Sequence, residues 1–298
     1  MRTSLAIGMS LNCALTCALA CALLGGCAII VNPGNDGDVQ VRTPFSSDTV
    51  DGNGMPARDA RAIGQVAGLE VNGSVLVDVR VGPASSLTVV ADSNLLPFIR
   101  TEVRGDRLVV EKTRSFRTNN PVRVTYTVPR LTDVRHSGSG RLSVEGLNGA
   151  PLLVQQSGSG ALLLTGRVAS FDATLNGSGS IDAATLQGAD VNLAVNGSGR
   201  VNVGHVQGER VTASLNGSGQ LRVAGTTRSL TARSSGSGHL DLVDLTSEQA
   251  DLSSTGSGGM TANVKQSLVA QNGGSGGIRV YGNPAQRSVS GKLVQLVN

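Results

Sequence analysis

The amino-acid sequence predicts an all-β protein whose main body is a parallel β-helix, also called a β-solenoid. A Gly-Ser-Gly triplet recurs eight times at steps of 18 to 20 residues, and a short alternating apolar strand follows each triplet. No stretch shows the 3.6-residue apolar period of a helix. The triplets begin at Gly138, Gly158, Gly177, Gly197, Gly217, Gly236, Gly256 and Gly274.

Each repeat contains two strands and a third apolar piece between them. An apolar residue such as Leu142 or Ile181 stands four positions after the first glycine, and a second one follows two positions later. A further strand with the same alternation closes most repeats, as in Phe171, Ala173 and Leu175. About 20 residues at roughly 3.3 Å each is a suitable contour for one turn, and turns stacked about 4.8 Å apart bury a continuous core.

The glycines mark a corner that recurs above itself in successive turns. Glycine accepts positive φ and close backbone approach because it has no Cβ atom, so the triplets are expected to be ordered corners rather than linkers. The residue before most triplets carries an amide or a hydroxyl, as in Asn176, Asn196 and Asn216, and these groups are expected to bond along the stack. The predicted corner glycines are Gly138, Gly140, Gly158, Gly160, Gly177, Gly179, Gly197, Gly199, Gly217, Gly219, Gly236, Gly238, Gly256 and Gly258.

Residues 1–26 are predicted to be a lipoprotein signal peptide. Arg2 is their only charged residue, and the apolar run that follows is short for a membrane span. The segment from Leu24 to Cys27 (LGGC) resembles the lipobox of bacterial lipoproteins, in which cleavage before the cysteine exposes it for acylation. Acyl chains on Cys27 would hold the protein at a membrane, since each buried CH₂ group contributes about 0.8 kcal/mol.

Residues 27–67 are predicted to be the lipidated N-terminus and a flexible tether, because Gly, Asn, Asp and Pro interrupt every apolar period. The alternative is a strand within Asp38–Thr43 that packs on the folded body. The folded domain is expected to span 68–298, with N-terminal strands at 68–135 and regular Gly-Ser-Gly turns at 136–291. The N-terminal strands either continue the solenoid as irregular turns or form a small sheet that caps it.

Composition argues against nucleic acid as a partner. The net charge of +4 becomes +3 once Arg2 is removed with the signal peptide, the positive residues are not clustered, and aromatic residues make up only 2% of the chain. All four cysteines lie at or before Cys27, so the expected body has neither a disulfide framework nor a cysteine metal site. No cofactor is predicted.

No catalytic or metal site is predicted either, so the protein is not expected to be an enzyme. Asp182 and Asp241 share an outward column but stand three turns apart, about 14 Å at 4.8 Å per turn. The histidines His136, His205 and His239 fall in different columns. The serines of the triplets have no stacked base that could activate them.

The sequence resembles the bacterial head-GIN domain family, which is also described as an autotransporter-adhesin head and as a domain of unknown function. The resemblance rests on Val128-Pro129-Arg130-Leu131 before the first triplet, on the triplet series, and on the closing segment 281–284 (YGNP). It covers about Leu69 to Val289 and implies a right-handed β-solenoid in an envelope protein, without an established enzymatic activity. The expected function is that of a lipid-anchored, non-catalytic structural or interaction module, related to adhesion. The alternative is a β-helix protein that binds or degrades polysaccharide.

The expected location is the bacterial outer membrane. In Gram-negative lipoproteins an Asp after the acylated cysteine favours the inner membrane, and Ala28 stands at that position here. The predicted partners are the membrane, through acyl chains on Cys27, and a protein or glycan whose identity the residues leave open. The apolar segment 292–298 (KLVQLVN) is either a final strand or a docking edge, so end-to-end self-association is a further expectation.

Overall fold

The structure is a computed structural model, and it describes residues 30–33, 39–42 and 49–297. The chain divides into two units, Met1–Thr49 and Val50–Asn298. In the first unit, strand β1 (Ile30–Pro33) pairs with strand β2 (Val39–Arg42) in antiparallel orientation. Strand β2 lies within the segment that the sequence analysis offered as an alternative strand. The predicted signal peptide and Cys27 lie outside the described residues.

The described residues of the second unit form strands and one 3-10 turn, at Leu96–Phe98. Its N-terminal strands are β3 (Val50–Asp51), β4 (Pro56–Arg61), β5 (Gly68–Asn72), β6 (Leu76–Val81), β7 (Ser86–Asp92), β8 (Ile99–Arg104), β9 (Arg107–Lys112), β10 (Phe116–Arg117) and β11 (Arg123–Val128). The strands that follow are β12 (Asp133–Gly138), β13 (Arg141–Asn148), β14 (Leu152–Gly158), β15 (Ala161–Gly177), β16 (Ser180–Gly197), β17 (Arg200–Gly217), β18 (Gln220–Gly236), β19 (His239–Ser254), β20 (Met260–Asn272), β21 (Ile278–Tyr281), β22 (Gln286–Gly291) and β23 (Val294–Val297).

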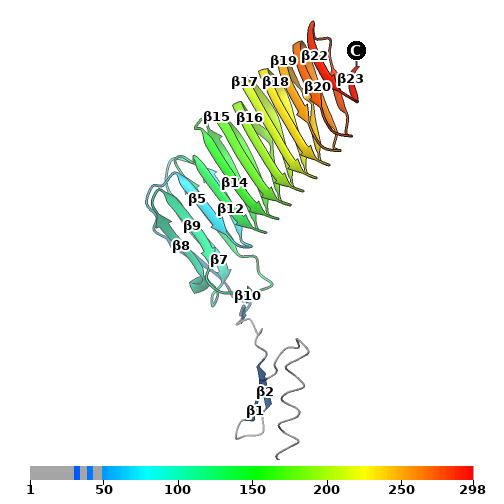
Figure 1. Cartoon of the computed structure of the whole chain (residues 1–298). Helices are drawn as coiled ribbons and strands as arrows, with labels where there is room; N and C mark the ends of the chain where they lie inside the picture. The colour runs from blue at the N-terminus through cyan, green and yellow to red at the C-terminus, as the bar shows by residue number, and fades with distance from the viewer. Residues whose placement is uncertain (1–29, 34–38, 43–48, 298) are drawn as a thin grey trace, which may run out of the picture. The chain divides into compact units, whose positions relative to one another are not determined.

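The strands from β12 onward stack as successive turns of a β-solenoid, which confirms the predicted fold (Figure 1). Each strand from β15 to β19 runs around a whole turn, and its two halves lie on two opposite faces. The first face is a parallel ladder in which Leu162 pairs with Ile181, and the second is a parallel ladder in which Phe171 pairs with Val191. A short third side connects the two faces, and the ladder register shifts there, for example between Ala183 and Gln187.

The N-terminal strands both continue the solenoid and cap it. Strands β5 and β6 pair in parallel with β12 and β13, so they form an irregular first turn. Beyond them the sheets change direction, because β8 pairs with β9, and β7 pairs with both β4 and β11, in antiparallel orientation. Both alternatives for these strands therefore occur together.

The folded unit begins at Val50 rather than at residue 68, so the predicted tether is too long. Strand β4 (Pro56–Arg61) belongs to this unit and pairs with β7. Its sequence, PARDAR, has no alternating apolar pattern, because its burial is only partial. The side chain of Arg61 helps to hold it in place by donating hydrogen bonds to the backbone oxygens of Leu96 (3.1 Å) and Ile99 (2.6 Å).

One continuous apolar core lies between the two faces. The first inward column is at most 1% exposed at every turn from β13 to β21, and each fully buried Val, Leu or Ile side chain contributes about 1.5–3 kcal/mol. The residues of this column are Leu142, Leu162, Ile181, Val201, Leu221, Leu240, Met260 and Ile278.

The Gly-Ser-Gly corners bring the backbones of neighbouring turns close together. The backbone oxygen of Gly158 accepts hydrogen bonds from the amides of Ser178 (3.1 Å) and Gly179 (2.9 Å) in the next turn. The same pattern recurs where Gly138, Gly217 and Gly236 act as acceptors. Each first glycine from the corner at 138 to that at 236 has positive φ, between 102° and 131°.

The two glycines of a corner are needed for different reasons. A Cβ atom on Gly197 would lie 2.5 Å from the oxygen of Gly177, and the φ of Gly197 is +127°. The second glycines have no positive φ, but a Cβ on Gly179 would lie 2.5 Å from the oxygen of Gly160. Gly256 and Gly274 depart from the other first glycines because they lack positive φ, although a Cβ there would lie 1.8 Å from the oxygen of Gly236 and 1.9 Å from that of Gly256, respectively. Close approach is therefore the requirement that all corners share.

Substitution of Gly197 by Val should destabilise the fold by about 1–3 kcal/mol or more, because it adds both backbone strain and a steric overlap. Urea unfolding followed by circular dichroism measures this loss. Gly64→Val is the matched control, since Gly64 has no positive φ and nothing lies within 4 Å of its Cβ position. Equal losses from both variants would contradict the assigned role of the corner.

Candidate interaction surfaces

The outward side of the second face presents mainly polar side chains, with exposed Leu153 and Val269 toward the two ends of one column. One of its columns contains Asp172 and Asn192, and Asn192 donates a hydrogen bond of 3.1 Å from its side-chain amide to Asp172. The column continues through Thr212, Thr231 and Asp251. Because strands repeat at about 4.8 Å, this face presents hydroxyls, amides and carboxylates at a fixed spacing.

An asparagine ladder runs beside the corners. Asn196 donates to the side-chain oxygen of Asn176 (2.9 Å), and Asn216 donates to that of Asn196 (3.1 Å). The expected bonding along this column is thereby confirmed for its three asparagines. The ladder uses part of the hydrogen-bonding capacity of each amide and leaves the rest facing solvent.

A hollow of about 600 Å³ lies on the third side, where the ladder register shifts. Arg167, Gln187 and His205 line it from three consecutive turns, and all three side chains are exposed. Arg167 donates from Nε to the side-chain oxygen of Gln187 at 3.1 Å. No carboxylate forms an ion pair with Arg167 among the residues that the structure describes, so the hollow presents hydrogen-bond donors. The apolar periodicity of the sequence did not predict this hollow. The hollow arises where bulges shift the strand register, and no residue pattern marks these bulges.

Among the described residues, the carboxylates and histidines do not gather into a metal-binding cluster. Arg222 forms ion pairs with Asp241 and Asp244, and the hydrogen bond that it donates to Asp244 raises the pKa of its guanidinium. His205 and His239 lie on different strands and are exposed. Within residues 30–33, 39–42 and 49–297, no group of three or more His, Cys, Asp or Glu side chains is placed to hold a metal ion. The same described part of the chain has no helix long and apolar enough to cross a membrane.

His136 is a buried polar residue whose burial the sequence reading missed. It occupies the inward column that continues through Gln156 and Leu175, and it is 0% exposed. Neither ring nitrogen has a hydrogen-bond partner among the described residues, and burial lowers the pKa of the imidazole. The sequence does contain a signal for this burial. His136 stands two residues before Gly138, and the residue at this position faces inward in every turn.

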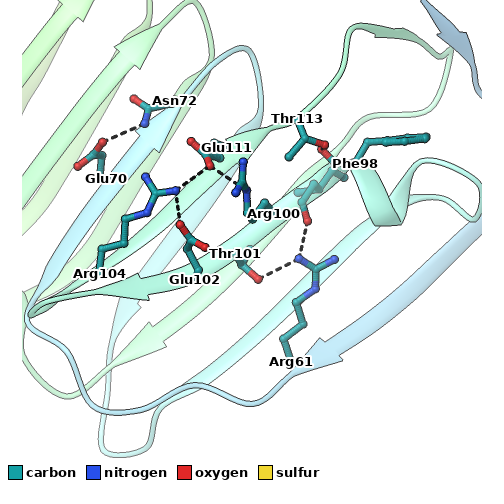
Figure 2. A network of polar contacts seen from close by, with 11 residues as sticks. Arg61, Glu70, Asn72, Phe98, Arg100, Thr101, Glu102, Arg104, Glu111 and Thr113 are labelled. Atoms are coloured by element: carbon teal, nitrogen blue, oxygen red, sulfur yellow. Dashed lines mark hydrogen bonds and ion pairs between the residues drawn. The ribbon is translucent and has the colours of Figure 1, made fainter.

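The N-terminal cap carries a network of paired charges (Figure 2). Glu111 on β9 forms ion pairs with Arg100 (2.9 Å) and Arg104 (3.1 Å) on the outermost strand, β8. Arg104 also pairs with Glu102, its neighbour on the same strand. Charges on an edge strand hinder pairing with a further strand, so this end of the solenoid is protected.

The stacked turns, glycine corners and repeated polar columns define a β-solenoid protein with surfaces suited to interaction. The family model described as "Putative auto-transporter adhesin, head GIN domain" matches residues 67–205 and 184–284. The matches together cover more than half of the chain, which therefore belongs to the head-GIN domain family, and the resemblance noted from the sequence is confirmed. A comparison with curated proteins gave no match.

Three crystal structures share the fold. One from Parabacteroides distasonis ATCC 8503, described as a "putative adhesin", has a TM-score of 0.64 at 21% identity and covers 84% of this chain and 100% of its own. A "putative lipid binding protein" from the same organism has a TM-score of 0.62 at 22% identity, with coverage of 84% and 100%. A "putative adhesin" from Parabacteroides merdae ATCC 43184 has a TM-score of 0.62 at 18% identity, with coverage of 85% and 100%.

The buried His136 should make stability fall in mild acid. Because its pKa in the folded state is lowered, the unfolded chain binds a proton first as the pH falls below about 6.5. Stability is therefore full above that value and is lost below it, at a rate of up to about 1.4 kcal/mol per pH unit from this group. Urea unfolding at pH 7.5, 6.5 and 5.5 measures the slope, and His136→Leu should reduce it. An unchanged slope in His136→Leu would show that other groups cause the loss, and His205→Leu is the control at an exposed site.

Proposed function

We propose that this protein is a lipid-anchored protein of the bacterial cell envelope whose β-solenoid is a non-catalytic interaction module related to adhesion. The observation that carries the proposal is the repeated polar side chains on the second face, where Asn192 bonds Asp172, together with the asparagine ladder beside the corners. A rigid array of this kind supports contact with an extended partner through many weak, equally spaced bonds. The family description as an adhesin head and the descriptions of two structural neighbours as adhesins support the same role.

The anchor in this proposal is Cys27, whose thiol and new amino terminus would carry acyl chains. Several chains are required for stable attachment, because one chain alone binds a membrane only weakly. The segment Leu24–Cys27 supports the attachment site, and Ala28 after the cysteine supports the outer membrane. In this proposal the β-solenoid domain that follows the anchor is the part of the protein that binds a partner.

Polysaccharide binding is the second candidate function, and the third-side hollow favours it. Arg167, Gln187 and His205 offer donors for the hydroxyl and carboxylate oxygens of a sugar. Polysaccharide cleavage has no such support, because Asp182 and Asp241 in the outward column stand three turns apart, about 14 Å, whereas the paired carboxylates of glycosidases lie about 5–9.5 Å apart. End-to-end self-association and the absence of a cofactor stay predictions.

Substitution of Cys27 by Ala should release the protein from the membrane fraction, because the acylated thiol would be lost. Detergent-phase partitioning and metabolic labelling with an acyl-chain analogue measure the anchor. Cys21→Ala is the matched control, since Cys21 lies inside the predicted signal peptide and should leave anchoring unchanged. Acylation that persists in Cys27→Ala would contradict the proposed site.

Protease treatment of intact cells should cleave the protein if the module faces outward, and protection would contradict a surface-adhesion role.

A further inference from the structure

The two ends of the solenoid differ in how their edge strands are protected. At the N-terminal end, strand β4 contains a proline and three charged residues, Pro56, Arg58, Asp59 and Arg61. Strand β8 carries the paired charges described above (Figure 2). Proline and charged residues are the means by which native proteins prevent further strands from adding to an edge.

The C-terminal end lacks this protection. Strand β22 pairs only with β20, and β23 pairs only with β21, among the strands that the structure describes (Figure 1). Strand β23 (Val294–Val297, VQLV) contains neither a charge nor a proline. Its outer edge presents backbone N–H and C=O groups that an additional extended strand can pair with. Val289 and Leu293 beside it are 44% and 56% exposed.

This end is also positively charged. Between residues 252 and 298 the basic residues are Lys265, Arg279, Arg287 and Lys292, and the same stretch contains no Asp or Glu. None of these four basic side chains forms an ion pair with another of the described residues. Arg279 lies one strand in from the edge, because it pairs with Gln295 on β23. Two C-terminal ends brought together would therefore repel each other.

A hollow of about 270 Å³ adjoins the same edge. His239, Arg279, Leu293 and Gln295 are among the residues that line it. Gly259 and Gly277, which stand directly after the last two corners at the position of His239 in the preceding turn, also line the hollow. The hollow is therefore placed to receive a side chain from a strand that adds to β23.

We propose that the β23 edge binds an extended acidic segment of a partner protein as an additional strand. The backbone of the segment pairs with Val294–Val297, its carboxylates face Arg279 and Lys292, and one of its side chains enters the hollow. This inference rests on the proposed interaction role and names the chemistry of one partner. Its test is carried out on the purified protein, so it does not depend on where the protein is located or how it is anchored.

The test uses fluorescently labelled eight-residue peptides that alternate Glu with Val or Lys with Val, added to the full mature chain at low salt. Anisotropy should show binding of the acidic peptide only, and binding should weaken as salt rises. The double variant Arg279→Glu with Lys292→Glu should weaken it by about tenfold or more. Arg141→Glu with Arg200→Glu is the matched control, because both arginines are exposed and lie away from this end.

Amide hydrogen exchange identifies the edge that is used. Binding of the acidic peptide should slow exchange in residues 294–297 and leave the N-terminal strand β8 unchanged. Four results would overturn the proposal: no binding of the acidic peptide, equal binding of both peptides, binding without protection of 294–297, or a dimer by light scattering whose formation protects 294–297. Circular dichroism of each variant confirms that a lost signal does not come from unfolding.

Discussion

The structure depends on the close approach of backbones at the Gly-Ser-Gly corners. A first-glycine oxygen such as that of Gly158 accepts two amides from the next turn, and no space remains for a Cβ atom. The corners therefore keep successive turns at strand spacing and in register. Everything else follows from that register: like residues stack on like, the inward columns make one core, and the outward columns make the asparagine ladder and the polar second face.

The repeat made much of this fold predictable, because one turn is nearly a copy of the next. The spacing of the triplets placed Leu162 against Ile181 and Asn176 against Asn196, as the ladders show. The N-terminal cap was not predictable in the same way. Strand β4 is held by backbone pairing with β7 and by the hydrogen bonds of Arg61. Neither contact requires alternating apolar residues, so the sequence PARDAR shows no strand pattern. The third-side hollow was not predicted because it arises from register shifts. The burial of His136 was not predicted because inward positions were recognised by their apolar residues, and His136 is polar.

The regular faces and the irregular features have different consequences for function. A polar array that repeats at each turn suits an extended partner, and no single residue in it is indispensable. The third-side hollow and the C-terminal edge occur once each and can discriminate between ligands. The N-terminal cap carries paired charges, whereas strand β23 has no charged residue. The C-terminal end of the solenoid is therefore the end at which an additional strand can pair more readily. Interaction specificity in this protein is thus expected where the repeat is interrupted.

The most direct measurement of the central claim is the stability of a chain from which one whole turn is removed. Deletion of residues 197–216 joins Asn196 to Gly217 and keeps every column in register. The expected product is a folded all-β protein with cooperative unfolding, whose solenoid is shorter by about 4.8 Å in small-angle scattering. Deletion of residues 197–206 alone should abolish folding, because it removes a corner and places Gln207 and Glu209 where the corner glycines Gly197 and Gly199 stood. If the two deletions had the same effect on folding, the stacking of equivalent corners would not be what holds the structure together.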